Sequence, residues 1–256
     1  MGSDLVDGRE HAAEPGEWTR VRRKGRRHHL NGHQHTALSR SHGNLPGLKI
    51  RPSFLSASDI EREHQRITGQ WGTSTCCRQL RLVIASRPSH PTITQAVCFG
   101  LGSFDPEDGS WDSRRRAHVQ LAALLCMVEQ LQRDNPEPIR CVFQEPIFNA
   151  VDKEFIRGLG YEVVDSPVGF ERVNSSTLVF GIHLYRDVYA QAIDKHLPAL
   201  FVGTPKDVWE ECHGTDSLDW VKLRELDDRC DKTTFPEDAG YTTFSSTAIH
   251  WRRDET

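Results

Sequence analysis

The chain has 256 residues, of which 37% are hydrophobic and 27% charged, and its net charge at pH 7 is −4. This length suits one domain with tails, and the low apolar share indicates polar segments outside a core. The longest apolar run covers only residues 121–128, whereas a membrane helix needs about 20 residues, which excludes a membrane-spanning function.

The first 55 residues are predicted to form a disordered basic arm. Between Trp18 and Arg51 there are nine Lys or Arg and no acid, so the rest of the chain carries −13. The arm lacks apolar periodicity and cannot offset the entropy of ordering. Residues 20–29, RVRRKGRRHH, are either a solvated tail, a nuclear-import signal or the one segment suited to nucleic acid phosphates. The start, MGSDLVDGRE, predicts no secretory signal, so we expect a protein of the cytoplasm and nucleus.

Residues 56–256 alternate between helical and strand patterns. A capping box of Ser58 and Glu61 begins the first predicted helix, in which Ile60, His64, Ile67 and Trp71 point inward. Further helices are predicted over residues 75–86, 113–133, 150–159, 183–196 and 216–230, the second of them capped by Ser113. Strands are predicted over 95–99, 139–144, 161–165, 177–182, 199–202 and 247–251.

This alternation predicts a Rossmann-like α/β three-layer sandwich with a mostly parallel central sheet and helices on both faces. Such sheets bind ligands outside the carboxyl ends of their strands. A small anionic or nucleotide-like ligand is therefore expected there, with its cofactor class undetermined. The candidate binding residues are Gly100, Gly102, Ser103, Arg116, Glu145, His183 and Gly203.

The glycine turn after the first predicted strand is a nonspecific indication of such a ligand. Gly100 and Gly102 let a ligand approach the backbone, and Glu145 ends the second strand where a ribose-binding acid would stand. A third glycine is missing and the spacing to Glu145 is too long for a dinucleotide fingerprint. A plain strand-to-loop turn remains the alternative.

The arginines at 114–116 and His183 each have two interpretations. Cations at a helix start oppose its dipole unless they hold an anion or are neutralised by nearby acids, such as those at 105, 107, 108 and 112. His183 is the one candidate for a catalytic base, or else a structural histidine. The seven cysteines lack zinc spacing and a disulfide pattern, so we expect no metal site and a reducing compartment.

Several segments together resemble the sensitivity-to-red-light-reduced family, also called the SRR-like domain, and most of all its fungal-type members. They are VCFGLGS (97–103), AHVQLA (117–122), FQEPIF (143–148) with Asp152, LG (159–160) and FSSTAIHW (244–251). Trp18 with its basic run resembles the family's amino-terminal segment. The domain would thus cover residues 56–256, with a core at 95–251.

The resemblance implies a regulatory protein rather than a known reaction. Family members are linked to circadian timing and light signalling, and to haem biosynthesis. Departures fall at the candidate site: Glu145 stands for the usual Asp, His118 for Arg, FGIHL (180–184) for a Met-Pro-His-Cys segment, and Gly203-Thr204-Pro205 for a Gly-Asn-Ser turn. These changes weaken any inference of a shared activity.

Three functions stay open. The leading one is a regulatory protein that binds protein partners. The second is an S-adenosylmethionine- or nucleotide-binding enzyme of methyltransferase type, which needs an open polar pocket at Gly102, Glu145 and His183. The third is a nucleic-acid-binding adaptor that uses the basic arm. An interaction protein should instead fill that pocket with its own side chains and expose an apolar patch elsewhere.

Overall fold

The computed structural model describes residues 55–87, 92–210 and 218–253. All of them belong to the unit that runs from Ile50 to Thr256. The predicted arm, apart from Leu55, and its basic run at 20–29 lie outside the described residues.

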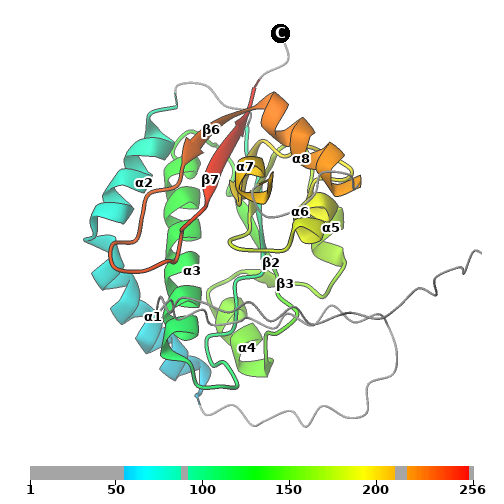
Figure 1. The fold of residues 1–256 in the computed structure, drawn as a ribbon. Helices are drawn as coiled ribbons and strands as arrows, with labels where there is room; N and C mark the ends of the chain where they lie inside the picture. The colour runs from blue at the N-terminus through cyan, green and yellow to red at the C-terminus, as the bar shows by residue number, and fades with distance from the viewer. Residues whose placement is uncertain (1–54, 88–91, 211–217, 254–256) are drawn as a thin grey trace, which may run out of the picture. The chain divides into compact units, whose positions relative to one another are not determined.

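One seven-stranded sheet forms the centre of this unit, in the order β3-β2-β1-β4-β5-β7-β6. In Figure 1, helices lie on both sides of the strands. The first five strands pair in parallel, and β7 pairs antiparallel with both β5 and β6. The α/β fold class with a mostly parallel sheet is thereby confirmed. The strands are β1 (Gln95–Phe99), β2 (Arg140–Gln144), β3 (Glu162–Val163), β4 (Thr177–Phe180), β5 (Leu200–Gly203), β6 (Cys230–Thr234) and β7 (Ala248–Arg252).

Helices cover both faces of the sheet. Successive side chains of a strand point to opposite faces and therefore enter two separate cores. Ala96 and Cys98 of β1 pack in the core built with α1 (Ala57–Gly72), α2 (Thr75–Ala85), α3 (Trp111–Gln132) and α4 (Ala150–Gly158). Val97 and Phe99 pack on the other side, in the core that includes α6 (Arg186–Ala192) and α8 (Leu218–Arg229). The remaining helices are α5 (Val168–Arg172) and α7 (Lys206–Glu210).

The long helix α3 is buried nearly all round in its middle. Every residue from Ala117 to Leu124 is buried, since α3 lies against the sheet while α1 and α2 pack on its outer side. Because α3 is covered on more than one side, even a polar residue such as His118 is fully buried in it.

Several predicted boundaries were wrong. The cap of α1 is Ser56, not Ser58: its hydroxyl accepts the Asp59 N–H, and the Asp59 carboxylate returns to the Ser56 N–H at 2.9 Å. Likewise Ser110, not Ser113, caps α3. The predicted helix over 183–196 begins only at Arg186 and ends at Ala192.

The strand β6 was missed entirely, along with the short helices α5 and α7. The expected helix over 216–230 ends at Arg229, and the chain then continues directly as β6. Four of the five β6 residues are exposed at the sheet's edge, so no apolar alternation marks the strand.

The predictions about cysteines and membrane spans can be compared with the described residues. There the six cysteines are free, buried thiols, among them the predicted core residues Cys98, Cys126 and Cys141. None of the described helices combines the length and the apolar character that a bilayer crossing requires.

Candidate functional site

The glycine turn that follows β1 is tied to the end of β2 by Glu145. Gly100 and Gly102 both adopt positive φ, +65° and +85°. The Gly102 N–H donates to Glu145 Oε2 at 2.8 Å, and the Ile147 N–H donates to Oε1 at 3.0 Å. Burial raises the pKa of this carboxyl against the lowering effect of the two N–H groups. Both Glu145 oxygens are thus engaged by the chain's own backbone.

Ser103 belongs to a second internal network, centred on Asp152 at the start of α4. Its hydroxyl donates to Asp152 Oδ2 at 2.7 Å, and the Phe104 N–H donates to Oδ1 at 3.0 Å. Asp152 also accepts the Asn149 N–H at 3.0 Å, as the second half of a capping box. The carboxyl is fully buried, and burial raises its pKa. Asp152 therefore anchors the loop after β1 to α4.

Two side chains from the segment after β4 pack against the glycines at the ends of β1, β4 and β5. A Cβ on Gly100 would lie 2.0 Å from Leu184 Cδ2, and one on Gly203 would lie 2.8 Å from Tyr189 Cε1. Gly181 is equally tight, with Leu184 Cδ1 at 2.5 Å. These glycines are close-approach positions, and the groups that approach them are Leu184 and Tyr189.

The buried hydroxyl of Tyr189 holds this arrangement together. It donates to the Gly181 carbonyl at 2.8 Å and accepts the N–H groups of Thr204 at 3.1 Å and Leu184 at 3.2 Å. A single phenol thereby joins the ends of β4 and β5 to the segment that covers them. Neither Leu184 nor Tyr189 was among the predicted site residues.

His183 and the arginines lie apart from this network. His183 is exposed at φ +55°, and its Nε2 donates to the Ser245 carbonyl at 2.7 Å. Glu145, Ser103 and His183, which the sequence suggested might converge, each have a different partner. Arg116 is half-buried in the early part of α3.

Acidic side chains neutralise the arginines that precede Arg116. Arg114 lies 3.6 Å from Asp105 and 3.5 Å from Glu63. Arg115 pairs with Asp238 at 2.8 Å. Asp105 is one of the four loop acids expected to do this, whereas Glu63 and Asp238 come from other parts of the chain.

A buried histidine pair between α1 and α3 was missed. The Nδ1 atoms of His64 and His118 are 3.2 Å apart. Burial lowers the pKa of His64 to about 4 and that of His118 to about 3. His118 Nε2 is 4.0 Å from Glu63 and makes no hydrogen bond with the described residues. Among the described residues no group of three or more His, Cys, Asp or Glu could hold a metal ion.

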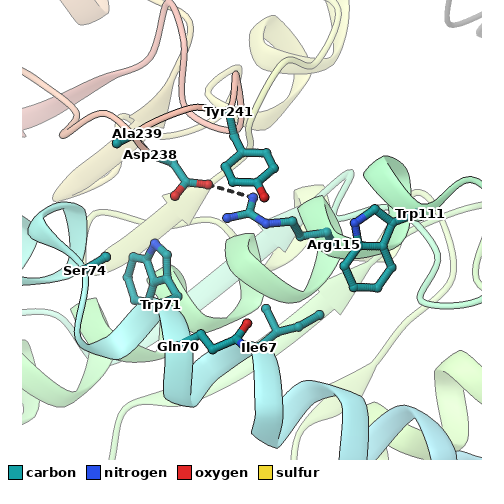
Figure 2. A pocket seen from close by; sticks show the side chains of 9 residues that line it. All are labelled: Ile67, Gln70, Trp71, Ser74, Trp111, Arg115, Asp238, Ala239 and Tyr241. Carbon is teal, nitrogen blue, oxygen red and sulfur yellow. Dashed lines mark hydrogen bonds and ion pairs between the residues drawn. The ribbon is translucent and has the colours of Figure 1, made fainter.

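A separate pocket of about 290 Å³ lies between α1, the start of α3 and the segment joining β6 to β7 (Figure 2). Aromatic and charged side chains alternate around it. Its lining consists of Ile67, Gln70, Trp71, Ser74, Trp111, Arg115, Asp238, Ala239 and Tyr241. Except for the arginine run, nothing in the sequence pattern pointed to this place.

Comparisons with known proteins identify the domain. A search of the curated proteins finds no match. One solved structure with a related chain path is a Listeria monocytogenes protein assigned as a class I S-adenosylmethionine-dependent methyltransferase. It has 10% identity and a TM-score of 0.39, over 78% of this chain and 70% of that one. The sequence model of the SRR1 domain matches residues 67–251, the greater part of the described chain, and the protein is accordingly a member of the SRR1 domain family.

Proposed function

We propose that this protein is a regulator that works by binding another protein, in the processes to which SRR-like members are linked. Those processes are circadian and light signalling and the control of haem biosynthesis. On this proposal the protein acts in the cytoplasm and the nucleus, and residues 20–29 direct its import.

The observation that carries the proposal is the filled carboxyl edge of the sheet. Leu184 and Tyr189 occupy the space that a cofactor would need above Gly100 and Gly203. The two oxygens of Glu145 are already bonded to backbone N–H groups. A bound nucleotide would have to displace all of these contacts at once, and each buried group left unpaired would cost about 1–3 kcal/mol.

Exposed aromatic residues elsewhere on the domain agree with a partner-binding role. Trp111 and Tyr241 are 47% and 51% exposed although both border one pocket. Tryptophan, tyrosine and arginine are enriched among the residues that carry most of the energy at protein interfaces. Arg115 lies between these two aromatics (Figure 2).

Thermal unfolding of the full chain with S-adenosylmethionine, NAD, ATP or haem separates this proposal from an enzyme of methyltransferase type. A ligand at 100 times its dissociation constant would raise the melting temperature by roughly 5–10 °C. We expect no rise for the wild type. A clear rise with one ligand that is lost in Gly102→Val would overturn the proposal in favour of that cofactor.

A cellular test addresses the regulatory role directly. Cells that lack the protein should show a changed haem content or a changed free-running rhythm, and the wild-type chain should restore it. A chain without residues 20–29 should restore it less well and should be depleted from the nucleus. Normal haem content and normal rhythm in the deficient cells would refute the proposed function.

A further inference from the structure

The pocket beside Trp71 contains a buried donor that lacks a strong acceptor. The indole Nε1 of Trp71 is buried, and its one polar contact among the described residues is with the sulfur of Cys76, a weak acceptor. The Trp71 side chain is only 4% exposed. Figure 2 shows the nitrogen on the edge of the ring nearest Asp238 in that view. A buried N–H of this kind calls for an acceptor inside the pocket.

An acceptor on the opposite side of the pocket is only half used. Asp238 is 5% exposed, and its Oδ2 takes both of its side-chain bonds, from Arg115 at 2.8 Å and from Thr243 at 2.9 Å. Asp238 Oδ1 makes no hydrogen bond with the described residues. The Trp71 N–H and Asp238 Oδ1 are thus a buried donor and a buried acceptor in one pocket, and the Arg115–Asp238 pair adds no net charge to it.

The walls of the pocket favour a flat, apolar ring. The Arg115 guanidinium stacks on the Tyr241 ring, with Cζ 3.3 Å from the ring centroid. Ile67 and the indole of Trp71 supply apolar surface. Trp111 stands at the exposed side, with Arg66 Cζ 5.6 Å from its centroid. Guanidinium and indole groups stack well on aromatic rings.

We infer that this pocket receives a tyrosine side chain of a partner protein. The phenol ring would stack between the aromatic walls, its oxygen would accept the Trp71 N–H, and its O–H would donate to Asp238. A phenol is a neutral, flat group that can donate and accept through one atom in this way. A carboxylate would face Asp238, and a cation would compete with Arg115 for it.

A polypeptide suits the pocket better than a free metabolite does. Its volume of about 290 Å³ is just below that of small-molecule sites, which span roughly 300–1,000 Å³, and is enough for a single side chain. Trp111, at the exposed side, remains outside as a rim for the flanking backbone. This inference rests on the proposed partner-binding function and supplies its docking residue.

The test follows the indole N–H signals of the ¹⁵N-labelled full chain during titration. The chain has six tryptophans, and Trp71→Phe identifies the Trp71 signal by its loss. N-acetyl-L-tyrosinamide should shift that signal saturably. N-acetyl-L-phenylalaninamide, which lacks the hydroxyl, should bind about tenfold more weakly, as expected for one unmade buried hydrogen bond. N-acetyl-L-leucinamide should leave the signal in place.

Two matched variants locate the binding. Tyr241→Ala removes the stacked ring and should weaken the tyrosinamide about tenfold. Tyr185→Ala removes a tyrosine of the same exposure, 51%, that does not line the pocket, and should change nothing. Equal losses in both variants would contradict binding at this site.

Other results would overturn the inference. A Trp71 signal that does not shift with the tyrosinamide would show that the pocket does not bind tyrosine. Equal affinity for the tyrosine and phenylalanine amides would show that the pocket does not recognise the hydroxyl. Tighter binding of free L-tyrosine than of its amide would assign the pocket to a metabolite instead. The two experiments fail independently. If the pocket does not bind the tyrosinamide, the cellular test can still support the proposed function. If deficient cells have normal haem content and rhythm, the titration can still show that the pocket binds tyrosine.

Discussion

Acidification should destabilise this domain through its buried histidines. His64, His118 and His250 are at most 7% exposed. Burial lowers the pKa of His64 and His250 to about 4 and that of His118 to about 3. Arg114 and Arg66 further disfavour a charge on His118. A histidine in the unfolded chain has a pKa of about 6.5. Between pH 6.5 and 4 the unfolded chain therefore binds more protons at these positions than the folded domain does.

The sign and the size follow from proton linkage. Stability from these groups is present above pH 6.5 and is lost as the pH falls towards 4. Each histidine with a folded-state pKa near 4 lowers the free energy of unfolding by about 2 kcal/mol between pH 7 and pH 5. Three such groups would lower the free energy of unfolding by about 6 kcal/mol, comparable with the whole stability of many domains. Burial raises the pKa of Glu145 and Asp152, so their protonation favours the fold and makes the net loss smaller.

Urea unfolding at pH 7, 6 and 5 measures this slope. The double variant His64→Gln/His118→Gln should be less stable at pH 7, yet its stability should fall by about 2 kcal/mol less per pH unit below pH 6. His196→Gln, at an exposed position, serves as the matched control with a wild-type slope. Identical slopes in the wild type and the double variant would refute the assignment of the acid sensitivity to the pair.

Three further predictions concern the sheet edge and the arm. Gly100→Ala should lower the free energy of unfolding by about 2–4 kcal/mol, since its Cβ would lie 2.0 Å from Leu184 and its φ is +65°. Adding Leu184→Ala should recover part of that loss. Strictly additive free energies in the double variant would argue against the contact. Asp152→Asn should cost about 2–3 kcal/mol in urea unfolding, because an amide NH₂ would face N–H and O–H donors; a near-neutral result would mean that the network contributes little. Removing residues 1–52 should leave the melting temperature almost unchanged, and a large fall would show that the arm is packed.

Strong periodicity explains the parts of the fold that were predicted well. The strand Gln95–Phe99 matches the expected bounds, and Ile60, His64, Ile67 and Trp71 all face inward from α1 as expected. Short or polar elements left no such signal: β6 is CDKTT, and α5 and α7 have five residues each. Cap positions shifted because several serines near each helix start are chemically equivalent until the fold selects one.

The sheet edge shows a different limit of sequence reasoning. Strand ends placed Gly100, Gly102 and Glu145 at one edge, and Glu145 does bond to Gly102 there. The side chain that packs on Gly100 is Leu184, from a segment that shares no pattern with it, and the neighbouring Ser103 bonds to Asp152. Asp152 had a local signal, since Asn149 and Asp152 have the spacing of a capping box, whereas Leu184 had none.

A glycine at the end of a strand indicates that another group approaches the backbone closely, but the sequence does not identify that group. In a nucleotide-binding sheet the approaching group is a phosphate; here it is the Leu184 side chain, which would collide with a Cβ at both Gly100 and Gly181. Glu145 keeps the position of a ribose-binding acid and uses its carboxylate to fix the turn. The predicted site residues Gly102 and Glu145 thus bond to each other, and a second pocket, with a buried indole N–H and a carboxylate in its lining, lies around Trp71 and Asp238.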